Sequence, residues 1–173
     1  DGIKVFGVES GNSLARVSWI QLESIQCVNL ATGIDLRLTA NSFISEIFCS
    51  ACLNGIVLTN CADTSMVNCK VQNGSGVGYY IKGDGAATGG GGSAYDEGTE
   101  ITNCTTNGQS QGIIVEGVDW GQVSNCAFTT AAGGALSTIG VNNNWKFTNC
   151  SFTSNNLATT NKSGADLSAD SNW

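Results

Sequence analysis

A period of about 22 residues runs through this chain and limits the folds that it can adopt. The period is marked by six cysteines, at Cys27, Cys49, Cys69, Cys104, Cys126 and Cys150. Their successive spacings are 22, 20, 35, 22 and 24 residues, so one interval contains an insertion of about 13 residues. Self-similarity at a fixed period of this length is typical of chains built from stacked repeats, in which each unit contacts its neighbours.

Two further markers keep the same phase. An Asn precedes each of the last four cysteines, at Asn68, Asn103, Asn125 and Asn149. A Gly opens a short segment of alternating apolar residues after each of the first five, at Gly33, Gly55, Gly78, Gly112 and Gly134, and Gly2 opens a matching segment. Each repeat holds short runs rich in Val, Ile, Phe and Thr, separated by Gly, Asn and Ser, which is typical of strands and turns. We predict an all-β fold in which each repeat turns once and stacks on the next at ~4.8 Å.

The Asn-Cys turn and the Gly-Ile-x-Leu strand, repeated over roughly residues 2–157, resemble the right-handed parallel β-helix proteins of the pectin-lyase-like superfamily. The resemblance implies a single-stranded parallel β-helix, or β-solenoid. Residues 1–173 would then form one such domain or a fragment of one, with a Gly-rich insertion loop at about 83–99. The alternatives are left-handed hexapeptide and ice-binding solenoids, but the chain lacks a six-residue period. Many pectin-lyase-like proteins are polysaccharide lyases, glycoside hydrolases or phage tailspike depolymerases, and the fold does not choose among these activities.

Charge and composition exclude several classes of function. Seven Lys and Arg against fourteen Asp and Glu give a net charge of −7, which repels the phosphate backbone of nucleic acids. No apolar run approaches the ~18 residues that a membrane helix requires. We therefore expect neither nucleic acid nor a membrane as partner. Because the chain has no His, the most common general base and metal ligand is missing, and we expect no metal and no cofactor.

The eight cysteines predict a ladder of buried thiols. Side chains one coil apart have parallel Cβ vectors, which is the wrong geometry for a disulfide. Cys52 and Cys61 lie outside the ladder, and only these two, with Cys49, could form a local pair. Reduced thiols indicate folding in a reducing cytosol, as for a virion component assembled in a bacterium. The expected location is a virion tail or the extracellular space.

The Gly-led strand defines two outward columns of side chains. The first and third residues after Gly face the interior, so the second and fourth face solvent. The second positions are Lys4, Asp35, Val57, Tyr80, Ile114 and Leu136, and the fourth positions are Phe6, Arg37, Thr59, Lys82, Glu116 and Thr138.

The candidate catalytic residues are carboxylates beside these columns. Glu116 and Asp119 could act as acid and base, with Asp84, one coil below, completing a cluster of three. The arrangement is similar to that of phage tailspike endoglycosidases, and the resemblance carries over by coil position only. The candidate substrate-binding residues are Trp120, Tyr80, Lys82, Arg37 and Tyr95. The competing interpretation is that Lys82 and Glu116 form a surface ion pair and that Asp119 is an ordinary turn residue.

Three functions follow from this pattern. The first is recognition and endo-glycosidic cleavage of a bacterial surface polysaccharide, as in a phage tailspike. The second is a non-catalytic carbohydrate-binding or shaft segment of a homotrimeric fibre or adhesin, in which a stripe of Phe6, Val57 and Ile114 packs against sister chains. The third is a polysaccharide lyase with Arg37, Lys82 or Tyr80 as base, although the calcium sites and Arg motifs of pectate lyases are missing.

Overall fold

The computed structural model of the chain describes residues 2–10, 13–83, 98–118, 120–131, 133–139, 142 and 144–154. Of residues 8–10, 13–15 and 154 only the backbone is described. These ranges contain 21 strands, joined by turns. No helix that is long and apolar enough to cross a membrane occurs among them.

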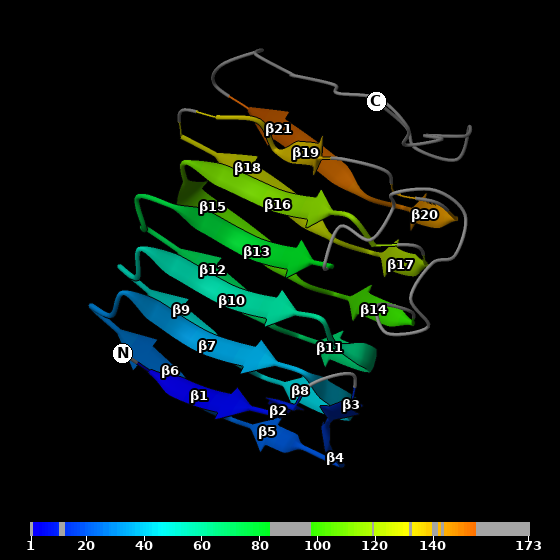
Figure 1. Cartoon of the computed structure of the whole chain (residues 1–173). Coiled ribbons are helices and arrows are strands. Elements are labelled where there is room, and N and C mark those ends of the chain that lie inside the picture. Colours follow the sequence, from blue (N-terminus) through cyan, green and yellow to red (C-terminus); the bar gives the residue numbers. More distant parts are fainter. Residues whose placement is uncertain are drawn as a thin grey trace.

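The strands form three parallel sheets that run along the coil, together with one small hairpin (Figure 1). The first sheet comprises β1 (Ile3–Phe6), β7 (Thr32–Arg37), β10 (Asn54–Thr59), β13 (Val77–Lys82), β16 (Gln111–Glu116) and β19 (Leu136–Ile139). The second comprises β4 (Val17–Ser18), β5 (Gln21–Glu23), β8 (Thr39–Ser45), β11 (Ala62–Val67), β14 (Thr99–Thr102), β17 (Gly121–Ser124) and β20 (Trp145–Thr148). The third comprises β6 (Gln26–Val28), β9 (Phe48–Ser50), β12 (Lys70–Gln72), β15 (Thr105–Gln109), β18 (Ala127–Thr130) and β21 (Ser151–Ser154). The antiparallel hairpin of β2 (Val8–Ser10) and β3 (Ser13–Ala15) is inserted in the first coil.

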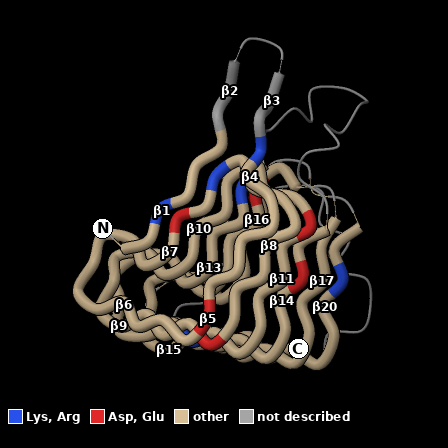
Figure 2. The backbone as a smooth tube through the Cα atoms, turned by 90° about the horizontal axis from the view of Figure 1, so that it is seen from below, with Lys and Arg blue, Asp and Glu red and all other residues tan. Residues whose placement is uncertain are grey.

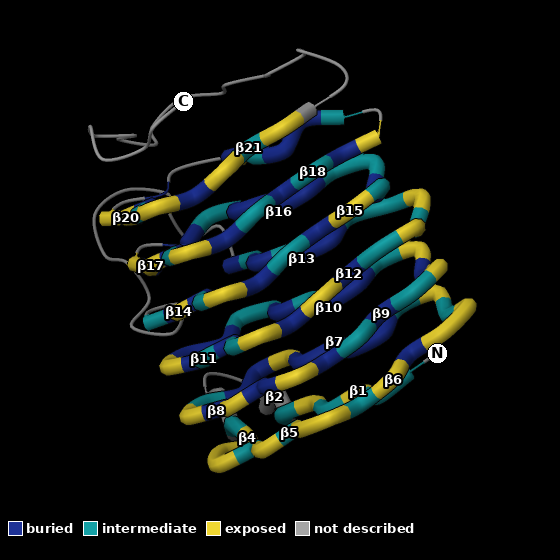
Figure 3. The backbone as a smooth tube through the Cα atoms, turned by 180° about the vertical axis from the view of Figure 1, so that it is seen from behind, coloured by how far each residue is buried: buried dark blue, intermediate teal, exposed yellow. Residues whose placement is uncertain are grey.

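The register of the first sheet confirms the predicted parallel β-helix. Ile34 pairs with Ile56, and Ile56 pairs with Tyr79, so neighbouring coils are displaced by 22 and 23 residues. The longer step from Tyr79 to Ile113 contains the predicted insertion, of which residues 84–97 lie outside the described ranges. The chain is thus an all-β, right-handed parallel β-helix. Buried residues alternate with more exposed ones along most strands of the second sheet, whereas β7 and β16 each bury four successive residues. The core lies inside the coil, which Figure 2 shows end-on and Figure 3 colours by burial.

The prediction for the last coil was wrong by one residue. Leu136 pairs with Ile113, so Ala135, and not Gly134, takes the place of the strand-opening Gly. A shift of one residue exchanges the two faces of a strand. Thr138 is therefore buried and Leu136 packs against the core, whereas Ile139 is exposed.

The thiols are buried as predicted, but the six cysteines that mark the repeat form two columns and not one. All eight cysteines lie in the described ranges, and none of them forms a disulfide. Cys27 and Cys49 pair in β6 and β9, and Val71 follows them in the next coil. A second column begins with Ile47 at the corner between the second and third sheets and continues through Cys69, Cys104, Cys126 and Cys150. The 20-residue spacing between Cys49 and Cys69 reflects this change of column.

The Asn before each of these four cysteines has a left-handed backbone, with φ between 51° and 55°. Asn tolerates this conformation better than most residues because its short side chain hydrogen-bonds locally. In addition, Asn149 Nδ2 donates to Asn125 Oδ1 at 2.8 Å, which extends the corner as an amide ladder. The repeated Asn thus turns the chain from the second sheet into the third.

Candidate functional site

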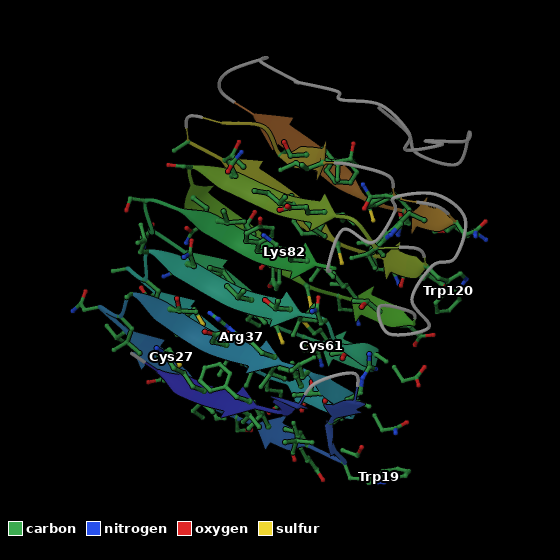
Figure 4. All side chains as sticks on the ribbon, viewed as in Figure 1. Trp19, Cys27, Arg37, Cys61, Lys82 and Trp120 are labelled. Carbon is green, nitrogen blue, oxygen red and sulfur yellow. The ribbon has the colours of Figure 1, made fainter. Side chains whose placement is uncertain are left out.

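The candidate site lies on the outer face of the first sheet, where three predicted residues come together. Lys82 pairs with Glu116 in the register between β13 and β16, and Tyr80 stands two residues before Lys82 on the same face. Lys82 Nζ lies 3.5 Å from Glu116 Oε1, and the Tyr80 hydroxyl donates a hydrogen bond to Glu116 Oε2. Figure 4 shows Lys82 and Arg37 over this sheet. Both carboxylate oxygens of Glu116 therefore have a partner from the neighbouring coil.

The predicted ion pair between Lys82 and Glu116 is present. The Lys82 side chain is 43% exposed and that of Glu116 is 26% exposed. A pair this open to water stabilises the fold by at most about 1 kcal/mol. Its main effect is to hold the Glu116 carboxylate in one position at the surface of a rigid sheet.

The Tyr80 hydroxyl keeps its proton at neutral pH. Burial, together with the hydrogen bond to the Glu116 carboxylate, raises the pKa of Tyr80 to about 12. A phenol with this pKa donates hydrogen bonds but is a poor base at pH 7. The raised pKa therefore argues against a polysaccharide lyase that uses Tyr80 as its base.

Arg37 lies elsewhere on the sheet, three coils from Glu116, or about 14 Å at ~4.8 Å per coil. Its guanidinium binds Asp35 with two contacts of 3.0 Å, and its Cζ lies 5.2 Å from the centre of the Phe6 ring. The hydrogen bond to Asp35 raises the pKa of Arg37. Asp35 is buried, contrary to the prediction, because it lies between Lys4 and Val57 in its column and beneath Arg37.

A groove of about 420 Å³ adjoins Arg37 at the end of the first sheet. Its lining residues are Phe6, Gly7, Arg37, Leu38, Thr59 and Asn60. The groove is shallow and holds no carboxylate among its lining residues. Arg37 therefore belongs to a surface separate from Glu116.

Trp120 lies at a corner and not on the first sheet. It lines a groove of about 280 Å³ with Asp63, Thr64, Ser65, Gly98 and Glu100, at the beginning of the second sheet. Sequence reasoning missed Asp63 and Glu100 as neighbours of Trp120. They would have been found by aligning the second strand of each coil, where Thr64, Thr99 and Gly121 stand in register.

Three predicted site residues, Asp84, Tyr95 and Asp119, lie outside the described residues. On the outer face of the first sheet, the carboxylates that the structure describes are Glu116 and the buried Asp35. The part of the chain that is described contains no cluster of three or more Cys, Asp or Glu side chains suited to hold a metal ion.

Because of Tyr79 and Tyr80, we expect the free energy of unfolding to fall in alkali. Tyr79 is fully buried, and its hydroxyl donates to the Cys69 carbonyl at 2.8 Å; burial raises its pKa well above the ordinary value. Because the folded state binds these protons more tightly than the unfolded state, their contribution is complete below pH ~10 and falls as the pH rises towards 12. Burial also raises the pKa of the Cys49 thiol, which adds a loss of the same sign from about pH 8.5.

We expect the urea midpoint of unfolding to fall between pH 10 and 12, and to fall less in Tyr79→Phe, which lacks the buried phenol. The measurement is urea unfolding at a series of pH values. The control is Tyr80→Phe, which keeps the fold and removes only the partly buried phenol. Tyr79→Asn would not serve as a control, because it opens a cavity in the core. An equal fall in the parent and in Tyr79→Phe would contradict the expectation.

Comparison of the chain with protein-family models, with curated proteins and with solved structures finds no match.

Proposed function

We propose that this chain recognises a bacterial surface polysaccharide and cleaves a glycosidic bond beside Glu116, in the manner of a pectin-lyase-like phage tailspike. The observation that carries the proposal is the cluster of Tyr80, Lys82 and Glu116 on the outer face of the first sheet. Functional side chains held on strands of a rigid scaffold keep their geometry when a substrate binds.

The cluster supports this chemistry in two ways. Glu116 is a partly exposed carboxylate in a fixed position, which suits one half of the acid and base pair that cleaves a glycosidic bond. Tyr80 and Lys82 are neutral and cationic donors that can bind sugar hydroxyls beside it. We assign the second carboxylate to Asp119 or Asp84, in keeping with their positions in the sequence.

The test is release of reducing ends from a panel of capsular polysaccharides and lipopolysaccharides. We expect Glu116→Gln to lower the rate by at least about 100-fold, because a positioned acid or base contributes about 10²–10⁴-fold. Asp119→Asn and Asp84→Asn identify the second carboxylate. Glu23→Gln is the matched control, since Glu23 is an exposed carboxylate on the second sheet.

Unchanged release by Glu116→Gln, with the thermal midpoint of the parent, would remove the assignment. An unsaturated product, detected by its ultraviolet absorbance, would favour elimination over hydrolysis. The absence of any product from the whole panel would favour the binding or shaft alternative.

A homotrimeric shaft is the second candidate, because large apolar side chains are exposed on the first coils. Besides Trp19, these residues are Phe6, Val17, Val28, Phe43 and Leu53. The stripe of Phe6, Val57 and Ile114 does not contribute as expected, since Ile114 is buried and Val57 is partly buried. Light scattering at micromolar concentration should give three times the mass of one chain, and a monomer would count against this candidate.

A further inference from the structure

Three of the six residues that line the groove beside Trp120 belong to one column that runs along the coil. The register places in succession, at or near the start of the second-sheet strands, Trp19, Asn41, Asp63, Gly98, Trp120 and Asn144. Five of the six have a left-handed backbone, with φ from 46° at Asp63 to 80° at Gly98. This conformation interrupts the regular alternation of a strand. The column is therefore a continuous corner along the coil.

Two tryptophans stand on this corner with their rings open to water. Trp19 is 83% exposed and Trp120 is 41% exposed. They are four coils apart, or about 19 Å at ~4.8 Å per coil. Figure 4 shows both on the same side of the molecule, away from Lys82 on the first sheet. By contrast, Trp145 is buried, and its Nε1 donates to the Val118 carbonyl at 3.0 Å.

On the floor of the groove, Asp63 lies directly against the backbone of Gly98, which leaves no room for a side chain at residue 98. A Cβ at Gly98 would lie 2.6 Å from Asp63 Oδ1, closer than nonbonded atoms normally approach. The volume of about 280 Å³ is at the lower limit of ordinary ligand pockets, which are about 300–1,000 Å³. The groove therefore suits one or two units of a longer chain that continues beyond it.

The lining residues select the chemistry of the occupant. An exposed indole offers an apolar face on which the C–H face of a sugar ring can stack. Asp63 and Glu100 can accept hydrogen bonds from sugar hydroxyl groups, as can the partly exposed Ser65. The six lining residues include two carboxylates and no Lys or Arg, so a uronate, a phosphate or a sulfate would be repelled.

We propose that this corner is a second carbohydrate-binding site, which takes a neutral glycan chain lying along the coil, with one sugar stacked on Trp120 and another on Trp19. The proposal rests on the polysaccharide recognition proposed above and adds to it a charge preference and a site beside the second sheet, distinct from the cluster of Tyr80, Lys82 and Glu116 on the first sheet. The site holds the polymer, while the first sheet acts on it.

The test measures binding by affinity electrophoresis in gels that contain dextran, mannan or galactan, with polygalacturonate as the anionic counterpart. The same gels are run with each bacterial polysaccharide that the chain cleaves. We expect retardation by at least one neutral glycan and none by polygalacturonate. Retardation by polygalacturonate alone would overturn the proposal.

The variants separate this site from the first sheet. Trp120→Ala should weaken binding about tenfold or more, and Trp120→Phe should restore most of it because the stacking surface is kept. Trp19→Ala should weaken binding to long chains only. Leu53→Ala is the matched control, because Leu53 is an exposed apolar residue at another corner. Unchanged binding by Trp120→Ala, with its thermal midpoint preserved, would overturn the proposal.

Failure of this proposal can be told from failure of the proposed cleavage. Glu116→Gln should retain neutral-glycan binding while it loses cleavage. If Glu116→Gln loses cleavage and Trp120→Ala keeps full binding, the second site is wrong and the cleavage assignment stands.

The double variant Asp63→Asn, Glu100→Gln tests the charge preference. It should bind polygalacturonate, because it removes both negative charges of the groove. Asn also accepts the left-handed backbone at residue 63. Continued exclusion of polygalacturonate by this folded variant would contradict the charge preference.

Discussion

Phe128→Ala should lower the free energy of unfolding by about 3–5 kcal/mol, because it leaves a large cavity in the centre of the coil. Phe128 is fully buried. Its ring lies edge-on to Tyr79, with centroids 6.0 Å apart, and is stacked on Phe152 at 5.4 Å. β18 and β13, which carry Phe128 and Tyr79, each pair with a strand on both sides, so they cannot move easily into the space. Urea unfolding monitored by circular dichroism measures the change.

Phe43→Ala is the matched control for this substitution. Phe43 lies on the outer face of the second sheet and is 41% exposed. Removal of its ring leaves no cavity, so we expect a loss of less than about 1 kcal/mol. Similar losses for the two variants would mean that the core of this coil is not packed as described.

Gly78→Val should destabilise the chain by about 3 kcal/mol or more, because the column of strand-opening glycines has no room for a side chain. A Cβ at Gly78 would lie 2.3 Å from Thr106 Cγ2 and 2.6 Å from the Gly112 carbonyl oxygen. Overpacking of a core costs about 1–3 kcal/mol when side chains can adjust, and more when a backbone carbonyl must move. The same urea experiment measures it, with Gly108→Asn as control.

Gly108 is a suitable control because it is restricted by its backbone and not by space. Its φ is +76°, and an added Cβ would come no closer than 3.4 Å to Asn73 Oδ1. Asn accepts left-handed backbone at small cost, so Gly108→Asn should change the stability by less than about 1 kcal/mol. The close approach of the coils would be contradicted if Gly78→Val lowered the free energy of unfolding only slightly, or if Gly108→Asn lowered it by as much as Gly78→Val.

Much of the fold could be predicted because local pattern and global repeat agree. The alternation after Gly33 and Gly55 predicts which side chains face the core, and the register confirms it. The shared position of Lys82 and Glu116 after Gly78 and Gly112 likewise predicts the observed ion pair. These inferences succeed because they need only the two-residue period of a strand, counted from the Gly that opens it.

Other features depend on contacts between residues that a local sequence pattern does not predict. Asp35 has an outward position in its strand and is nevertheless buried, since Arg37 folds over it. Ala135 replaces Gly in the last coil, and Cys49 does not share a column with Cys69. In the last two cases the count along the chain was one or two residues from the register that hydrogen bonding between coils selects.

The residues alone determine that this chain coils, which side of each strand is apolar and that its thiols are buried, because burial of apolar surface follows the alternation of side chains. The folded stack is required to show which residues of different coils become neighbours. Trp120, Asp63 and Glu100 meet because coils of unequal length are brought into one register by their ladder hydrogen bonds. A shift of a single residue would have turned these side chains to the other face.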